Sequence, residues 1–215
     1  MTTIYSKLDK ELPSAKNNLR REFNRLSLMG FDELNVLNTR RTTEQMYKRL
    51  SQRNERLYLD SGYFAYVFSF GQASKFGFSG KRRKIDKKWV DGYLQRYNPV
   101  TRYIYEKEVE RRRMRLNECI LTDREFDSRE NFQADVRRSA SYWWTQTMQY
   151  GIGVCDAAMM DAFSDCGVKR VRWVTMDDSR VCRECKKRNG MIYDIDHVPP
   201  KDHYGCRCIL VPVRE

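Results

Sequence analysis

Residues 171–213 read VRWVTMDDSRVCRECKKRNGMIYDIDHVPPKDHYGCRCILVPV, and this stretch decides the fold of the C-terminal part of the chain. It contains a C-x-x-C pair followed by an H-x-x-C-x-C motif, and the two motifs comprise Cys182, Cys185, His203, Cys206 and Cys208. Protein zinc sites use four ligands, commonly thiolates and imidazoles, and a C-x-x-C turn points two thiolates at one centre. The stretch therefore predicts a metal site, and zinc suits these ligands best.

Five side chains are available for four ligand positions. The preferred set is Cys182, Cys185, His203 and Cys206, and the alternative places Cys208 in one of the last two positions. Buried free thiols and two disulfides are the competing interpretations, and nothing in the sequence suggests secretion, which disfavours disulfides. A site closed by four protein ligands is structural, so we expect the metal to fold a segment too small to build a core alone.

The residues around the cysteines predict three short strands, at 170–175, 191–195 and 208–213. Alternation in the first strand places Val171, Trp173 and Thr175 on one face. Asn189 and Gly190 predict a tight turn before the second strand. Pro212 indicates that the third strand lies at an edge of the sheet.

This combination of residues resembles the C-terminal signature of the phage Mu F-like minor head proteins, also called head-morphogenesis proteins of tailed phages. The resemblance is carried by Trp173, Asp177 or Asp178, Val181-Cys182, Cys185, Asn189-Gly190, Pro199-Pro200, His203, Cys206-Arg207-Cys208 and Pro212. One position departs from the pattern, because Tyr204 stands where the family usually has a proline. That difference concerns backbone stiffness rather than ligand chemistry.

The resemblance implies a non-enzymatic virion component with a structural Zn²⁺ ion. Such a protein is made in the host bacterial cytoplasm and is present in few copies inside the head, near the portal. Its implied partners are the portal protein and the major capsid protein. Its implied roles are head assembly and genome packaging or ejection.

The composition is that of a folded protein with a basic surface. Of the 215 residues, 40% are hydrophobic and 13% are aromatic, which indicates a packed core. No apolar run is long enough to span a membrane, and the N-terminal residues do not resemble a signal peptide. The net charge of +12 attracts polyanions such as double-stranded DNA, although solubility alone explains it equally well.

The part of the chain before the cysteines predicts helices, so the expected fold class is α+β, with a mostly helical body at 1–167 and a zinc-binding β module at 168–215. In this body, Pro13 is expected in the first turn of a helix, Thr42 and Thr43 at a helix cap, and Gly151 and Gly153 at a helix break. Cys119, Cys155 and Cys166 are expected to be core residues. The expected helices lie at 5–28, 44–57, 86–97, 101–119, 127–149 and 154–166, and the aromatic stretch 57–70 is either a helix or two strands.

A glycine-rich loop at 71–80 precedes a run of basic residues. These residues are the candidates for contact with phosphate groups, and the competing interpretation is a solvated charged surface. They are Lys81, Arg82, Arg83, Lys84, Lys87 and Lys88.

Motifs for other chemistry are scarce. Serine nucleophile elbows and phosphate-binding glycine loops are absent from the sequence. Asp196 and His197 resemble the start of a histidine–asparagine–histidine nuclease core, in which His197 would be the general base, but the following residues do not predict the helix that this core needs. Asp177 and Asp178 are interpreted as turn residues or partners of Arg180. The chain is therefore predicted not to be an enzyme, and the alternatives are a zinc-containing DNA-binding protein or a metal-dependent nuclease.

Overall fold

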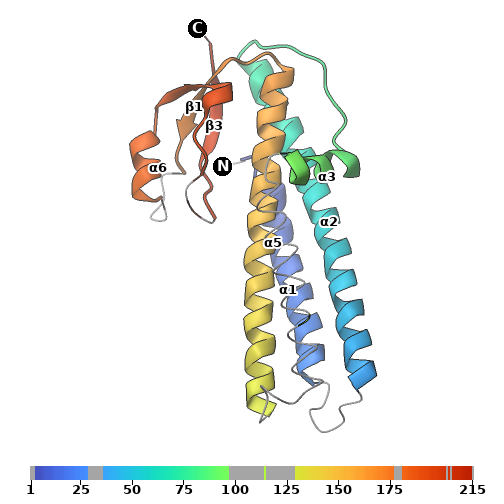
Figure 1. Cartoon of the computed structure of the whole chain (residues 1–215). Helices are drawn as coiled ribbons and strands as arrows, with labels where there is room; N and C mark the ends of the chain where they lie inside the picture. Colours follow the sequence, from blue (N-terminus) through green and yellow to red (C-terminus); the bar gives the residue numbers. More distant parts are fainter. Residues whose placement is uncertain are drawn as a thin grey trace. The chain divides into compact units, whose positions relative to one another are not determined.

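The computed structural model describes residues 3–28, 36–96, 114, 129–176, 181–201, 203 and 205–214. Among these residues, the helices that precede a small sheet are α1 (Ser6–Leu28), α2 (Val36–Lys75), α3 (Lys87–Arg96) and α5 (Arg129–Asp165) (Figure 1). The sheet region consists of β1 (Arg170–Val174), α6 (Arg183–Arg188), β2 (Ile192–Asp194), the 3-10 helix η2 (Ile195–His197) and β3 (Ile209–Val213). The predicted α+β class, mostly helical with a small C-terminal antiparallel sheet, is confirmed.

The chain divides into two compact units, and the long helices α1, α2 and α5 each contribute residues to both. Unit 1 consists of Met1–Lys10, Tyr58–Tyr93 and Gln149–Glu215, and unit 2 of Glu11–Leu57 and Leu94–Met148. The sheet and the candidate metal ligands belong to unit 1, together with the beginning of the chain. The change from helix to sheet falls between α5 and β1, and the domain boundary predicted at residue 167 remains a prediction.

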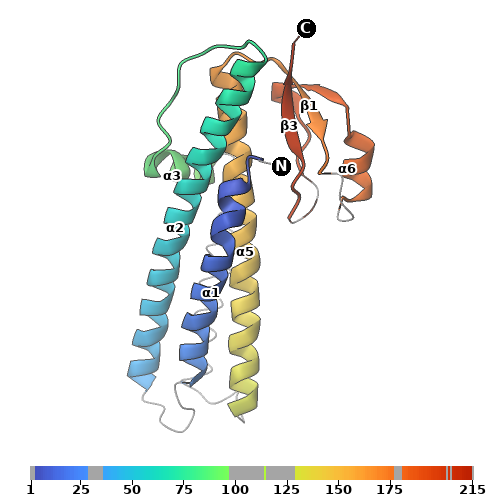
Figure 2. The same ribbon diagram turned by 180° about the vertical axis from the view of Figure 1, so that it is seen from behind.

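In unit 2, parts of α1, α2 and α5 run side by side around an apolar core (Figures 1 and 2). The aromatic ring of Tyr47 lies 5.1 Å from that of Trp143, measured between centroids. At the edge of this core, Arg49 donates to the buried carboxylate of Glu22 over 2.6 Å, and this hydrogen bond lowers the pKa of Glu22. The core residues are Leu19, Phe23, Leu26, Met46, Tyr47, Leu50, Val136 and Trp143.

The sheet of unit 1 has the strand order β2-β1-β3, with both pairs antiparallel. Val171 and Trp173 on the central strand are buried, as the alternation predicted. Pro212 lies on β3, which is an edge strand, so its missing N–H group costs no ladder hydrogen bond on the outer side. Gly190 has φ +82, which fits the predicted turn before β2.

The helices α2 and α5 are longer than the sequence predicted, whereas α1 and α3 lie within one residue of the predicted bounds 5–28 and 86–97. The predicted helix 44–57 and the aromatic stretch 57–70 form one helix, α2, which begins before Thr42 and Thr43, so the predicted cap is wrong. The aromatic stretch is helical because its rings pair at helical spacing: Phe64 stacks on Phe68 with centroids 6.0 Å apart. The first five residues of the predicted loop 71–80 are helical, because α2 continues to Lys75.

Two residues expected to interrupt helices lie inside them. The helix α5 runs through Gly151 and Gly153, so the predicted break is wrong. Gly151 instead makes room for Leu8, since a Cβ at this position would lie 2.6 Å from the Leu8 Cδ1 atom.

Pro13 lies within α1 rather than in its first turn, because the helix already begins at Ser6 and the buried Leu8 anchors its start.

The remaining predictions have mixed outcomes. The helix predicted at 86–97 is α3, which Asp86 caps by accepting a hydrogen bond from the Trp89 N–H group over 3.0 Å. The helix α5 ends at Asp165, one residue before the predicted end at 166, and Gly167, with φ +71, follows it. Cys155 and Cys166 are buried free thiols, whereas the predicted helix 101–119 and Cys119 lie outside the described residues apart from residue 114. No helix in the described part of the chain is long and apolar enough to cross a membrane.

Two glycines of α2 provide a test of packing in unit 1. A Cβ at Gly71 would meet no atom within 4 Å, whereas a Cβ at Gly62 would lie 2.8 Å from Val154 Cγ1 and 3.3 Å from the Trp89 ring. We expect Gly71→Ala to raise the free energy of unfolding by about 0.5–1 kcal/mol, because alanine is the better helix former. Gly62→Ala gains the same propensity but overpacks the core, so we expect a net loss of about 1–2 kcal/mol.

Urea unfolding followed by far-UV circular dichroism measures both variants. The two substitutions make the same chemical change in the same helix, so their difference isolates the effect of the surroundings. Equal shifts in one direction would contradict the packing described for Gly62.

Candidate metal centre

The first ligand pair is built around the start of the short helix α6. Cys182 is the N-cap of this helix, and its Sγ atom accepts a hydrogen bond from the Cys185 N–H group over 3.3 Å. This hydrogen bond lowers the pKa of the Cys182 thiol. The Cys185 side chain, one helical turn further on, is fully buried. The C-x-x-C turn therefore directs both sulfur atoms to the same side, as the sequence predicted.

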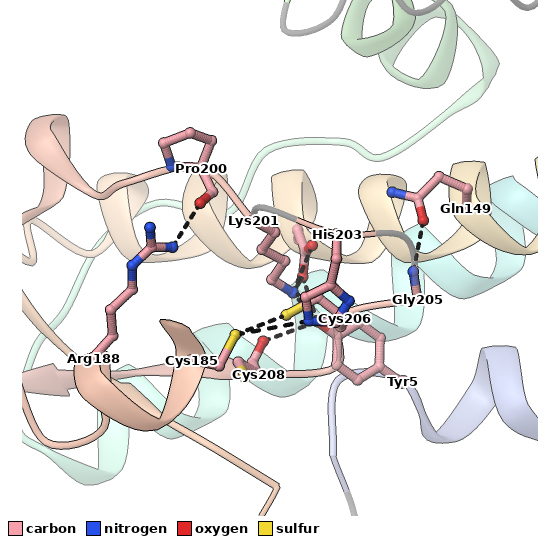
Figure 3. A network of polar contacts seen from close by, with 11 residues as sticks. Tyr5, Gln149, Cys185, Arg188, Pro200, Lys201, His203, Gly205, Cys206 and Cys208 are labelled. Carbon is pink, nitrogen blue, oxygen red and sulfur yellow. Dashed lines mark hydrogen bonds and ion pairs between the residues drawn. The ribbon is translucent and has the colours of Figure 1, made fainter. Parts of the chain in front are cut away.

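The second motif approaches the same point from the loop before β3. Cys185 Sγ lies 3.6 Å from Cys206 Sγ and 3.9 Å from His203 Nε2 (Figure 3). Ligand atoms within 4.8 Å of one another form two groups, one of Cys182, Cys185 and His203 and one of Cys185, Cys206 and Cys208. All five predicted ligands thus converge, and Cys185 is common to both groups.

The distances between the sulfur atoms fit a tetrahedral zinc ion. Zinc–sulfur bonds of about 2.3 Å at tetrahedral angles place two sulfur atoms about 3.8 Å apart. The separation of 3.6 Å between Cys185 and Cys206 is close to this value. The residues present therefore fit zinc, which would be held by Cys185 with three of the other four side chains.

Electrostatics also favour a cation at this point. Burial raises the pKa values of the Cys185 and Cys208 thiols, and neighbouring cysteines raise that of Cys185 further. Thiolates gathered this closely repel one another in a medium of low dielectric constant. A divalent cation offsets that repulsion, and zinc binding displaces the thiol protons.

A network of polar side chains supports the ligand loop from behind. Lys201 donates to the Asp156 carboxylate over 2.8 Å and to the Cys206 carbonyl oxygen over 3.3 Å. The Tyr5 hydroxyl donates to Asp156 over 2.5 Å and lies 3.1 Å from the Cys208 carbonyl oxygen. Burial and the Asp156 carboxylate raise the pKa of Tyr5, so its hydroxyl stays protonated and remains a donor.

Further contacts tie the same loop to the beginning of the chain and to α5. Arg207 pairs with Asp9, and its guanidinium group lies 4.7 Å from the centroid of the Tyr5 ring. Gly205, with φ +74, donates its N–H group to Gln149 over 2.9 Å (Figure 3). Tyr5, Asp156 and Lys201 were not predicted from the sequence, because no local pattern links residues so far apart along the chain.

Other predicted residues lie elsewhere. His197 is exposed on η2 and belongs to neither group of ligand atoms found among the described residues. Asp177, Asp178, Arg180 and Tyr204 lie outside the described residues. The structure therefore offers the nuclease interpretation no support.

The predicted phosphate-binding residues follow α2 and extend into the start of α3. The Arg83 guanidinium group donates to the carboxylates of Asp161 and Asp165. Arg82 lies over the Phe70 ring, 4.9 Å from its centroid, and Lys84 lies 3.5 Å from Asp86 while remaining largely exposed. Lys81, Arg82, Lys84, Lys87 and Lys88 are exposed, and Arg83 is also partly open to solvent, with 35% of its side chain exposed.

Replacing the cysteine common to both ligand groups gives the sharpest test of the metal centre. We expect the purified chain to contain about one zinc ion, and Cys185→Ser to lose it, because either choice of four ligands requires Cys185. Elemental mass spectrometry measures the metal content. The control is Cys166→Ser, which removes another buried thiol away from the cluster and should retain zinc. Zinc retained in full by Cys185→Ser would contradict the site.

The choice between His203 and Cys208 is testable with cobalt in place of zinc. If the preferred set is correct, His203→Ala removes the nitrogen ligand and Cys208→Ser leaves the cobalt spectrum nearly unchanged. Thiolate-to-cobalt charge-transfer absorption counts the sulfur ligands, and titration measures the metal affinity. A spectrum altered by Cys208→Ser but not by His203→Ala would establish the alternative set.

Comparison with known proteins adds an independent observation. Residues 105–211 match the family described as Phage Mu protein F like protein. No curated protein and no solved structure matches the chain significantly. The matched residues include α5, the whole of the sheet except its last two residues, and every candidate ligand. The resemblance seen in the cysteine motifs is thereby confirmed, and the chain belongs to the phage Mu F-like family of head-morphogenesis proteins.

Proposed function

We propose that this chain is a minor head protein of a tailed bacteriophage, present in few copies inside the head near the portal. The observation that carries the proposal is the family match, because it extends through the entire ligand cluster. Membership of a phage head family implies a location in the virion. The proposed roles in head assembly and in genome packaging or ejection go further than membership alone.

The zinc ion has a structural role in this proposal. The sheet of unit 1 is too small to supply much of a core, with strands of five, three and five residues. Metal binding supplies folding free energy to such segments. It would hold α6 against the loop before β3 and thereby keep the surface of this module in one arrangement.

The proposal includes no catalytic activity. The family is one of structural phage proteins, and the absence of catalysis in this chain remains a prediction. Closing the site with four protein ligands would leave no position for a reactive water molecule.

The proposed partners are the portal protein, the major capsid protein and double-stranded DNA. The net charge of +12 supports the last of these, because a packaged genome presents a dense array of phosphate groups. The exposed basic residues around α3 are the proposed DNA contacts, and their attraction for the backbone would be independent of base sequence.

The test of the main proposal is the protein content of assembled heads. In phage producing this chain, we expect purified heads to contain it in far fewer copies than the major capsid protein, as measured by quantitative mass spectrometry. We expect Cys185→Ser to reduce that content by at least about tenfold, because the zinc-held module would unfold. Cys166→Ser should be incorporated normally. Heads that lack the wild-type chain altogether would overturn the proposal.

Binding to DNA is tested separately with the purified chain and short duplex DNA. Lys81→Gln and Lys84→Gln should each weaken binding and lower the slope of log K against log salt by about 0.9, the value for one phosphate contact. Fluorescence anisotropy at several salt concentrations measures both quantities. Unchanged affinity and slope would mean that these residues only form a solvated surface.

A further inference from the structure

We propose that Arg83 does not contact DNA but positions its basic neighbours for that contact. This inference rests on the proposed DNA binding and concerns the segment from residue 78 to residue 88, called here the basic strap. The strap connects α2 to α3 and passes the C-terminal end of α5 (Figure 1). In sequence, Arg83 looks like any other member of the basic run.

The Arg83 side chain uses three of its nitrogen atoms within the protein. Its Nε and Nη2 atoms donate to the two carboxylate oxygens of Asp165, over 2.6 and 2.5 Å. Its Nη1 atom donates to Asp161 over 2.6 Å. A bidentate pair of this kind fixes the orientation of the guanidinium plane. Two carboxylates also offset the charge of Arg83, so little of it is available to a phosphate group.

Neighbouring groups complete the anchor. Tyr66 donates to Asp165 over 2.7 Å and accepts the Arg83 backbone N–H group over 2.9 Å. Burial and the hydrogen bond to Asp165 raise the pKa of Tyr66 to about 12, which keeps the hydroxyl protonated as this arrangement requires. The Trp89 indole N–H group donates to the same Asp161 oxygen as Arg83, over 2.7 Å.

Two further residues hold the strap close to α5 and to its own unit. A Cβ at Gly80 would lie 1.7 Å from the Asp165 carbonyl oxygen, so the backbone approaches the end of α5 as closely as glycine permits. Ile85 is buried. The basic strap is therefore attached at Gly80, Arg83, Ile85 and Trp89, the residue that follows it.

The remaining basic residues lie between these attachments and face solvent. They are Lys81, Arg82, Lys84, Lys87 and Lys88. Attachment on both sides limits the backbone freedom of these residues before any ligand arrives. Binding then costs less conformational entropy than it would for an unattached charged loop. Duplex DNA suits such a surface, because its phosphate groups form a regular array of negative charge.

The decisive variant is Arg83→Lys, which keeps the charge but cannot form the bidentate pair. If Arg83 positions the strap, Arg83→Lys should weaken binding to a short duplex DNA by about 2- to 10-fold at every salt concentration, with an unchanged salt slope. Arg83→Gln/Asp165→Asn, which leaves the net charge unchanged, should behave in the same way. The matched control Lys84→Arg should bind like the wild type, whereas Lys84→Gln should lower the slope by about 0.9.

A second measurement keeps the inference independent of affinity alone. Trypsin should cut the wild-type strap slowly and the Arg83→Lys strap rapidly, while zinc content and circular dichroism stay the same. The inference is overturned if Arg83→Lys binds DNA like the wild type while Arg83→Gln/Asp165→Asn lowers the slope as Lys84→Gln does. If the wild type itself binds no DNA, the DNA-contact proposal fails and takes the inference with it.

Discussion

The candidate metal centre depends on one constraint, the burial of several sulfur atoms around Cys185. The Cys185 side chain is fully buried, and those of Cys206 and Cys208 are nearly fully buried. The sulfur atom of Cys206 lies 3.6 Å from that of Cys185. Hydrocarbon side chains at these positions would explain burial by the hydrophobic effect, but thiols beside a histidine nitrogen at 3.9 Å form a ligand set. A cation held by these side chains would link α6 to the loop before β3, in a segment too small to build a core of its own.

The backbone carbonyl groups of Cys206 and Cys208 connect the candidate ligand loop to Lys201 and to Tyr5 near the beginning of the chain. Lys201 and Tyr5 approach the carbonyl oxygens of Cys206 and Cys208, so the ligand loop has metal ligands on one side and a polar network on the other. The network is satisfied by Asp156 from α5, which accepts from both Lys201 and Tyr5. A buried network of this kind stabilises one arrangement only when each member has its partner. Unit 1 is therefore assembled from three distant stretches of sequence.

How much of this was predictable from the sequence follows from the range of each interaction. The clustering of the candidate ligands was predictable because a chelating pair has a fixed spacing in the local sequence, as in Cys182 and Cys185. The edge position of β3 was predictable from the missing N–H group of Pro212. The ends of α1 and α3 were predicted to within one residue, whereas the break at Gly151 was predicted wrongly, because tertiary packing overrides its local preference. Gly151 is retained in α5 for the space it gives Leu8, and nothing near residue 151 in the sequence reveals that partner. Tyr5 and Asp156 were missed for the same reason.

Predictions from charge patterns are limited for a related reason: the sequence of a basic run does not show which of its residues pair with acidic residues in the folded protein. Within the basic strap, Arg83 faces Asp161 and Asp165, which stand one helical turn apart on α5 and so present their carboxylates to one guanidinium group. Lys84 lies 3.5 Å from Asp86 and remains largely exposed. Two adjacent cations in the sequence thus differ in kind, since one is committed to internal structure and the other remains available to solvent and ions. In any run of basic residues, those already paired with acidic residues of the same protein should not be counted as contacts for a polyanion.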